Sequence, residues 1–307
     1  MTTTPLVSIF CEVYNHERFL RNCLDGFVKQ RTDYPFEILI HDDASTDNSA
    51  SIIKEYADKY PGLVFPIFQT ENKYSQGIGI RKEYQYPRAK GKYIAICEGD
   101  DYWTDPLKLQ KQVAYMEAHP DCSLCFGNAM LHWEDDDLLP DRPYSEWENK
   151  EYNEMDILWD WRVPTATFLF RRDITESPLF PKFMSDPKMV VDDLPLFLTC
   201  ANNGYLYAFS DYFSVYRKHG KSFTMNVDAS RRKRLGEMWE QIPAIFGKQY
   251  TDVTFFYAVI NYRRGMKSAI NEGNRDLYKF LKRKIIKLYA LHPKSGMIRI
   301  RKIIQER

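Results

Sequence analysis

The chain lacks the features that mark secreted and membrane-spanning proteins. No apolar run among its 307 residues approaches the ~20 residues that a membrane-spanning helix needs, and no signal peptide opens the sequence. The six cysteines are scattered, and Cys122 and Cys125 have CxxC spacing without the second pair of a zinc site. We therefore expect reduced, buried cysteines in a cytosolic protein.

Two common phosphate-binding motifs are missing as well. No GxGxxG follows the first apolar run and no Gly-Lys-Ser/Thr loop occurs anywhere, which argues against a dinucleotide dehydrogenase and a P-loop NTPase. Hydrophobic residues make up 44% of the chain and aromatic residues 15%. That composition suffices for one large domain, or for one domain with an appendage.

Charge is distributed unevenly, although the net charge is only +1. Residues 225–307 contain 19 Lys and Arg against 7 Asp and Glu, a net of +12, and residues 1–224 have a net of −11. We expect residues 225–307 to form a separate basic, helical region, whose amphipathic stretch 277–289 suits anionic lipid headgroups. The alternative is that these helices pack on the acidic domain and only balance its charge. No nucleic-acid-binding module is recognisable, so no nucleic-acid partner is expected.

Strand-like and helical patterns alternate in the first hundred residues. This alternation predicts a doubly wound α/β sheet in which the strands are parallel. Asn15 is expected to cap the first helix, and Thr104 or Asp105 a later one. The expected strands are residues 6–11, 35–41, 63–68 and 93–97, with helices after the first two, a loop and helix over 69–90, and a further strand over 164–172.

Polar and acidic residues follow three of these strands. They are the segments 12–15, 42–43 and 98–101. Because ligands of such sheets lie beyond the carboxyl ends of the strands, the three groups should converge. Neighbouring carboxylates repel one another unless a cation lies between them, and hard oxygen ligands suit Mg²⁺ or Mn²⁺. The alternative for 98–101 is an acidic turn that leads into a helix.

These motifs resemble those of the family 2 glycosyltransferases, which have the Rossmann-like GT-A fold. The order, the spacing and the strand-end placement of the motifs carry the resemblance over the first ~105 residues, and more loosely to about Ser222. Glu98 stands where the family's metal motif usually begins with Asp. The matching segments are Val13-Tyr14-Asn15-His16-Glu17, Asp42-Asp43-Ala44-Ser45-Thr46-Asp47 and Glu98-Gly99-Asp100-Asp101.

The resemblance implies a site for a nucleoside-diphosphate sugar, with a UDP-sugar favoured. Asp42 or Asp43 would accept the N–H of the base, and Asp100 and Asp101 would share ribose contact and metal coordination. A divalent Mg²⁺ or Mn²⁺ would stabilise the diphosphate leaving group. The residues expected to bind the donor nucleotide are Cys11, Glu12, Tyr14, Asn15, Asp42, Asp43, Glu98 and Asp100; the metal ligands are Asp100, Asp101 and His219; Arg217 and Lys218 would neutralise phosphate.

A displacement at the anomeric carbon also needs a general base for the acceptor hydroxyl. The family places an Asp at the start of the helix after the central sheet, and here the resemblance implies Asp193, with Asp192 beside it. The alternative, which is compatible with this role, is that either Asp caps that helix. Asp192 and Trp103 are assigned to the acceptor side. The segment 134–137 is predicted to be a solvated acidic turn.

The sequence therefore predicts an inverting, metal-dependent glycosyltransferase. Residues 1–224 would form the GT-A catalytic domain, with a donor half (1–105) and an acceptor half (106–224), followed by the basic helical region 225–307. The acceptor would be a glycan or a lipid-linked molecule in bacterial surface-polysaccharide assembly. The protein would be cytoplasmic or peripheral on the inner face of the cell membrane. A nucleotidyltransferase and a non-catalytic nucleotide- or glycan-binding relative are the alternatives.

Overall fold

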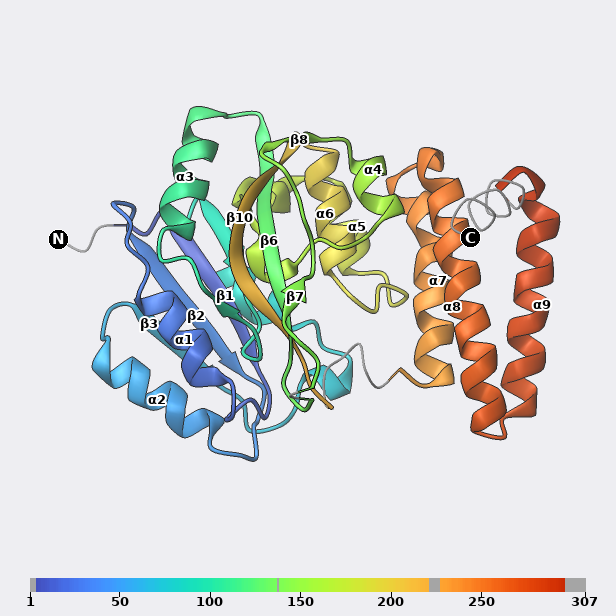
Figure 1. Cartoon of the computed structure of the whole chain (residues 1–307), viewed down its shortest axis with the longest axis horizontal. Coiled ribbons are helices and arrows are strands. Elements are labelled where there is room, and N and C mark those ends of the chain that lie inside the picture. Colours follow the sequence, from blue (N-terminus) through green and yellow to red (C-terminus); the bar gives the residue numbers. More distant parts are fainter. Residues whose placement is uncertain (1–3, 137, 221–226, 296–307) are drawn as a thin grey trace. The chain divides into compact units, whose positions relative to one another are not determined.

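The computed structural model describes residues 4–136, 138–220 and 227–295 (Figure 1). The chain forms two compact units: Met1–Ser177 with Cys200–His219, and Pro178–Thr199 with Gly220–Arg307. The predicted domain boundary after residue 224 and the basic residues 299–302 lie outside the described residues.

The described part of the first unit is built on one ten-stranded sheet. Its strand order is β3-β2-β1-β4-β9-β6-β10-β5, with β7 on β6 and β8 on β10. The half that comes first in the chain is parallel, as predicted. It consists of β1 (Val7–Val13), β2 (Phe36–Asp42), β3 (Val64–Phe68) and β4 (Tyr93–Ile96).

Apolar strands and amphipathic helices account for the formation of this parallel half of the sheet. All of β1 except Glu12 is buried, as expected of a parallel strand covered on both faces. Helix α1 (Leu20–Val28) buries Leu20, Cys23, Leu24 and Phe27, whose spacing forms one apolar stripe. The next helix is α2 (Ser49–Lys59). All six cysteines are buried free thiols, which confirms their predicted role in the core.

The other half of the sheet departs from simple parallel winding. Strand β9 (Leu169–Arg171) is antiparallel to both β4 and β6 (Cys122–Trp133), whereas β10 (Tyr205–Lys218) is parallel to β6. The predicted strand 164–172 is thus shorter and preceded by a 3-10 turn, Thr165–Thr167. The remaining elements are β5 (Tyr102–Trp103), α3 (Lys108–Ala118), β7 (Arg142–Pro143), β8 (Lys150–Tyr152), α4 (Glu154–Trp159), a π-helical turn at Arg81–Gln85 and 3-10 turns at Tyr74–Gln76, Tyr86–Arg88 and Arg172–Glu176.

Two predicted helix caps are wrong. Asn15 does not cap α1, which begins at Leu20; it has a φ of 57° in the left-handed region, and its side chain accepts a hydrogen bond from Thr46 N at 2.7 Å. Asp105 accepts from Leu107 N at 2.8 Å, one turn before α3 begins at Lys108. The Asp105 side chain stabilises a local turn before the helix, whereas the Asn15 side chain links its turn to the segment at Thr46.

The second unit is helical in its described residues. It contains α5 (Leu179–Met184), most of α6 (Asp193–Ala201), α7 (Ala229–Phe246), a 3-10 turn (Lys248–Tyr250), α8 (Thr251–Asn271) and α9 (Arg275–Leu291). Helices α7, α8 and α9 lie side by side, which confirms the predicted helical C-terminal region (Figure 1). None of the helices described is both long and apolar enough to span a membrane.

Candidate functional site

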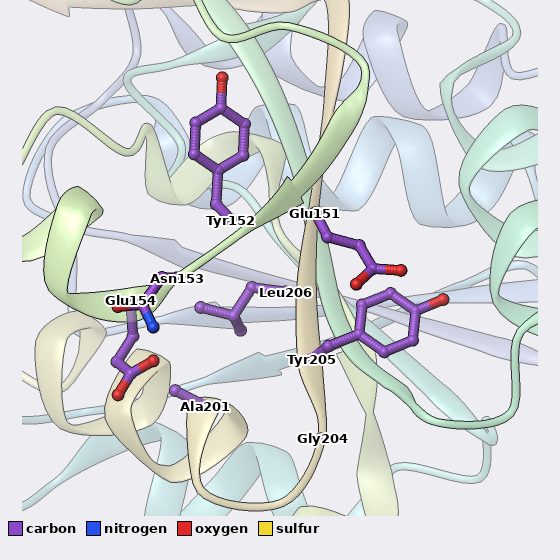
Figure 2. Close-up of a pocket in the computed structure, with 8 residues that line it drawn as sticks. All are labelled: Glu151, Tyr152, Asn153, Glu154, Ala201, Gly204, Tyr205 and Leu206. Carbon is purple, nitrogen blue, oxygen red and sulfur yellow. The ribbon is translucent and has the colours of Figure 1, made fainter.

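One hollow of the first unit lies apart from the predicted site residues (Figure 2). It has a volume of about 470 Å³ and is formed by β8, the start of α4, the end of α6 and the start of β10. Its lining includes Tyr152, Glu154 and Tyr205, and it contains none of the residues that the sequence motifs single out. The candidate site is therefore assembled from the strand ends and not from this hollow.

The carboxyl ends of β1, β2 and β4 meet, as the sequence predicts. Val13 of β1 is in register with Asp42 of β2, and Asp43 N donates to Val13 O at 2.9 Å. Beyond β4, Gly99 N donates to Glu12 O at 3.0 Å. A Cβ atom at Gly99 would lie 2.8 Å from His16 Nδ1, so the close approach of the two segments requires glycine there.

A buried arginine joins two of the strand ends. Arg81 donates to Glu12 Oε2 at 3.0 Å and to Glu98 Oε1 at 2.5 Å. Burial raises the pKa of Glu98 to about 7, with Glu12 and Asp100 adding to the rise and Arg81 opposing it. The sequence motifs do not point to Arg81. It lies in the π-helical turn Arg81–Gln85, and only the fold brings that turn to the acids.

Replacing Arg81 by methionine should destabilise the protein, because two neighbouring carboxylates would lose their counter-charge. Loss of one partner of a fully buried ion pair costs ~3–5 kcal/mol. The exposed fractions of the Glu12 and Glu98 side chains are 20% and 34%. For this partly solvated cluster we expect about 2 kcal/mol in the free energy of unfolding, measured by urea denaturation.

The exposed neighbour Lys82 offers the matched control. Lys82→Met should change the unfolding free energy by less than about 0.5 kcal/mol. Adding Glu12→Gln to Arg81→Met should restore part of the loss, since it removes one of the two opposing charges. Equal effects of the Arg81 and Lys82 substitutions would contradict the bridging role.

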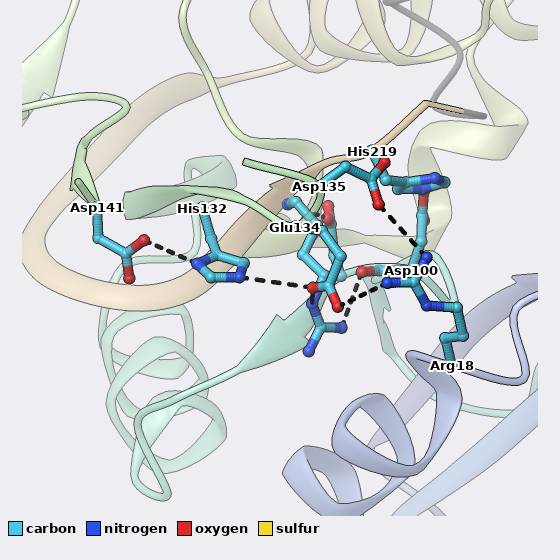
Figure 3. Close-up of polar contacts among 9 residues, drawn as sticks. Arg18, Asp100, His132, Glu134, Asp135, Asp141 and His219 are labelled. Atoms are coloured by element: carbon cyan, nitrogen blue, oxygen red, sulfur yellow. Dashed lines mark hydrogen bonds and ion pairs between the residues drawn. The ribbon is translucent and has the colours of Figure 1, made fainter. Parts of the chain in front are cut away.

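Asp100 and His219 lie within hydrogen-bonding distance of each other (Figure 3). His219 Nε2 is 3.2 Å from Asp100 Oδ2, and the His219 ring packs on Phe19 with centroids 4.6 Å apart. Burial acts to raise the pKa of Asp100, but the hydrogen bond with His219 and the nearby His16 outweigh it, so the pKa lies below its ordinary value. His16 Nδ1 is buried and has no hydrogen-bond partner among the described residues.

Asp101 has different surroundings from Asp100. Its Oδ1 accepts a hydrogen bond from Arg217 N at 2.9 Å, which ties the acidic loop to the end of β10. Burial raises the pKa of Asp101 well above its usual range, and the charges of Asp100 and Glu98 add to the rise. The geometry thus favours Asp100 over Asp101 as the carboxylate that meets a cation.

The residues at this loop fit a divalent cation that is shared with a substrate. Within the described residues, no three His, Cys, Asp or Glu side chains are grouped to hold a metal by themselves. Asp100 and His219 together provide one oxygen and one nitrogen ligand. Mg²⁺ typically takes one or two carboxylates, with water and phosphate oxygens completing its shell, and imidazole is acceptable to Mn²⁺ and similar ions.

Asp42 and Asp43 also differ in their surroundings. The carboxylate of Asp43 accepts from Lys73 N at 2.8 Å and from Tyr74 N at 3.0 Å, so it holds the loop after β3. Asp42 Oδ1 is buried and accepts no hydrogen bond from the residues described. Burial raises the pKa of Asp42, and contacts with Ser45 oppose the rise. Asp42 therefore has the acceptor atom that remains for a ligand N–H.

The predicted nucleotide-binding residues of β1 and the following turn face different ways. The thiol of Cys11 is in the core, 3.9 Å from Cys23 Sγ, so its side chain is not available to a ligand. Tyr14 is 45% exposed and leaves a ring face open to solvent. Asn15 N donates to Ser45 Oγ at 2.9 Å, which joins the first turn to the second.

Arg217 and Lys218 lie on opposite faces of β10. Arg217 donates to Asp100 O at 3.0 Å, its guanidinium lies 4.4 Å from the Tyr102 ring, and it pairs with Glu134 at 3.3 Å. Because successive side chains of a strand alternate, Lys218 points away from this cluster. The two cations predicted to bind phosphate therefore do not face the same point.

The prediction of a solvated turn at residues 134–137 holds for the exposed Asp135 and Asp136 but not for Glu134. Glu134 pairs with Arg217 and with Arg18, at 3.3 and 3.5 Å, and lies 3.5 Å from His132 (Figure 3). The carboxylate is attached to the end of β6, and β6 runs beside β10. That pairing places Glu134 next to the Asp100 loop. Residue 137 lies outside the described residues.

The structure also differs from the prediction that Trp103 lies on the acceptor side. Its side chain is 3% exposed, and the indole Nε1 donates to Ala166 O at 2.7 Å. The ring packs edge-on against Phe27, and Lys108 Nζ lies 4.1 Å from its centroid. Trp103 therefore belongs to the core and does not present a face to an acceptor.

Asp192 and Asp193 belong to the second unit. Asp193 is the first residue of α6, and its Oδ1 accepts from Leu194 N at 2.7 Å. Asp192 O accepts from Leu196 N at 2.9 Å, as at a helix start. Asp100 belongs to the first unit, and the role of Asp193 as the base stays a prediction.

Comparison with known proteins agrees with this arrangement of residues at the strand ends. Residues 8–178 match the family model described as Glycosyl transferase family 2. An uncharacterized protein of Mycobacterium tuberculosis is 35% identical over 237 residues, which are 76% of this chain and 64% of that protein. The chain thus spans less than two thirds of that relative. The putative teichuronic acid biosynthesis glycosyltransferase TuaG of Bacillus subtilis is 25% identical over 230 residues, 75% of this chain and 85% of TuaG.

Solved structures share the fold. TarS of S. aureus in complex with UDP-GlcNAc superposes with a TM-score of 0.61 at 14% identity, covering 94% of this chain and 92% of that one. The mannosyltransferase PcManGT of Pyrobaculum calidifontis, in complex with GDP-Man and Mn²⁺, gives 0.53 at 16% identity, covering 97% and 84%. The predicted GT-A fold class is confirmed, and with the family match over more than half of its length the chain belongs to glycosyl transferase family 2.

Proposed function

We propose that the protein transfers a sugar from a nucleoside-diphosphate sugar to a hydroxyl group of a glycan or lipid-linked acceptor, with a divalent cation and with inversion. The observation that supports this proposal most directly is the ionised Asp100 beside His219, where the strand ends converge. UDP-GlcNAc in TarS and GDP-Man with Mn²⁺ in PcManGT support this ligand class. A UDP-sugar is the favoured donor.

The chain's own groups would divide the work in the following way. Asp42 Oδ1 would accept an N–H of the base, and Asp100 with His219 would hold the cation. When bound, that cation would neutralise charge on the departing diphosphate. Asp193 would take the proton of the acceptor hydroxyl as its oxygen bonds to the anomeric carbon and the bond from that carbon to the diphosphate oxygen breaks. A single displacement of this kind inverts the configuration.

A thermal-shift screen tests the donor site. Purified protein would be heated with UDP, GDP, dTDP, CDP, CMP or ATP, each with and without Mn²⁺. One nucleoside diphosphate should stabilise the protein by ~2–3 kcal/mol at about 100-fold above its Kd, and only when the metal is present. If no nucleotide stabilises the protein under any metal condition, the proposal fails and a non-catalytic binding role takes its place.

The setting that we propose is bacterial surface-polysaccharide assembly on the cytoplasmic face of the membrane, with TuaG as the supporting relative. Helix α9 offers the contact surface. Ile286 and Leu291 are 60% and 61% exposed, and the exposed Lys279, Arg283 and Lys287 lie on the same helix. Exposed apolar groups among cations suit a surface of anionic lipids.

Binding to vesicles tests this contact. Replacing Lys279, Arg283 and Lys287 together by alanine should weaken sedimentation with phosphatidylglycerol vesicles by roughly 100-fold, since each cation near such a surface contributes ~1 kcal/mol. Alanine at the exposed Lys54, Lys82 and Lys90 of the first unit is the control with equal charge change. If both triple variants lose binding equally, net charge and not α9 is responsible.

A further inference from the structure

A second hollow of the first unit is lined by cations and aromatic rings. Its volume is about 280 Å³, and its lining includes Arg142, Arg162, Lys218, Trp133 and Tyr144. The other lining residues are aliphatic, and among the described residues that line it none is acidic. We call it the Arg142 cavity.

The sheet separates this cavity from the acidic cluster around Asp100. In the parallel pairing of β10 with β6, Lys218 is opposite Trp133, and Arg217 is opposite His132. Paired residues share a face of the sheet, and neighbours along a strand point to opposite faces. Lys218 and Trp133 therefore face the cavity, whereas Arg217 and His132 face the other side.

The two faces differ in how their charges are paired. On the side of Arg217, Glu134 and Asp135 approach Arg18, and Asp141 Oδ1 lies 2.7 Å from His132 Nδ1 (Figure 3). On the cavity side, Arg142 is exposed and forms no ion pair with any residue that the structure describes, although Arg162 is paired with Asp160. The cavity therefore has at least one cation whose charge no described group balances.

Aromatic rings lie next to these cations. The Tyr144 ring meets the Tyr216 ring at 5.0 Å with an interplanar angle of 67°, and Lys218 Nζ is 5.2 Å from the Tyr216 centroid. Trp133 is half-buried, which leaves part of its surface accessible. Ring faces bind the apolar faces of sugars, and Arg binds phosphate or carboxylate through paired hydrogen bonds. A neutral sugar has no charge for the cations to bind, and a small free anion has no apolar face for the rings. A ligand that uses both features therefore has a sugar face and an anionic group.

We propose that the Arg142 cavity binds an acidic glycan, that is, a sugar chain bearing phosphate or carboxylate groups, and that this glycan is the acceptor. The inference rests on the proposed function and defines its acceptor class. Lys218 at the cavity is the chain neighbour of both Arg217 and His219, which contact Asp100. The part of a polymeric acceptor that binds at this end of β10 would thus lie near the residues that contact Asp100, because these residues are consecutive in the chain.

Calorimetric titration of the full chain tests the proposal. The probes are tetragalacturonate, phosphorylated maltotetraose, neutral maltotetraose and a thymidylate tetranucleotide. The wild type should bind one or both acidic glycans at least about tenfold more tightly than the neutral glycan and the oligonucleotide. Arg142→Glu should weaken the acidic glycan by about tenfold or more. Lys54→Glu, at an exposed position of α2, is the matched charge reversal and should leave binding within about twofold.

Binding of the nucleoside diphosphate with Mn²⁺ is measured on the same samples. If it fails in the wild type, the proposed function fails, whatever the glycans do. If it holds in the wild type and in Arg142→Glu, the glycan result decides the inference by itself. The inference is overturned if neither acidic glycan binds, if the neutral glycan or the oligonucleotide binds as tightly, or if Arg142→Glu and Lys54→Glu behave alike. Because Arg142 is exposed, the variant should keep the wild-type melting temperature.

Discussion

Replacing Asp193 by asparagine should lower the turnover number by roughly 10²–10⁴-fold while donor binding is unchanged, because general-base catalysis contributes about that factor. The amide oxygen of asparagine can still accept the hydrogen bond that Leu194 N donates to Asp193 at 2.7 Å. The start of α6 therefore keeps its local structure, whereas the ability to accept a proton is lost. Turnover with saturating donor and metal is the measurement.

Asp186 offers a matched substitution in the same unit. Its Oδ1 accepts from Lys188 N at 2.9 Å, so it too stabilises a turn through one carboxylate oxygen. Asp186→Asn should keep turnover within about twofold of the wild type. A turnover that survives Asp193→Asn would remove Asp193 as the base and leave it only the role of a helix-start residue.

Substitution of Asp100 by asparagine should abolish the metal-dependent stabilisation by nucleotide, a loss of ~2–3 kcal/mol at about 100-fold above the wild-type Kd. Turnover should fall by about 10³-fold or more, since the cation that stabilises the leaving group is no longer held. The physical reason is the removal of the one charged ligand beside His219, 3.2 Å away. Nucleotide titrations at increasing Mn²⁺ measure the effect.

Asp101→Asn is the control one residue away. Burial raises the pKa of Asp101 well above its usual range, and asparagine imitates the neutral form that burial favours. It also keeps an acceptor for Arg217 N. We expect a change of less than about 1 kcal/mol in the free energy of unfolding, with nucleotide stabilisation retained. The reverse pattern, with Asp101→Asn inactive and Asp100→Asn active, would exchange the two roles.

These two predictions address different units of the chain. Asp100 belongs to the first unit and Asp193 to the second. The expected losses differ in kind, because Asp100→Asn should remove nucleotide binding whereas Asp193→Asn should leave it intact. The pair therefore separates failure of the donor site from failure of the base assignment.

Much of the candidate site at the strand ends could be predicted from the sequence, for a physical reason. Parallel strands must align their carboxyl ends at one edge of a sheet, so residues after β1, β2 and β4 meet there whatever the loops do. Periodic burial sets those strands and their covering helix α1. The segments at Glu12, Asp42 and Glu98 thus had to converge once the alternation of strands and helices was recognised.

Other features depended on contacts that no local pattern encodes. Arg81 reaches Glu12 across 69 positions of the chain, from a turn without a strong periodic signal. Tryptophan is a residue type that often stacks on sugars, but packing against Phe27 and Lys108 places Trp103 in the core. Burial is a property of the assembled core, so a residue type alone could not reveal it.

The sequence by itself determined the parallel half of the sheet, the helical C-terminal region and the place where the acids gather, because periodicity and strand direction follow from local residue order. Only the tertiary structure decided which acid faces outward, which face of β10 carries each cation and that β9 enters antiparallel between β4 and β6. Those features follow from long-range pairing, in which a shift of one residue exchanges the two faces of a strand. The separation of Arg217 from Lys218, and with it the Arg142 cavity, is a consequence of that pairing.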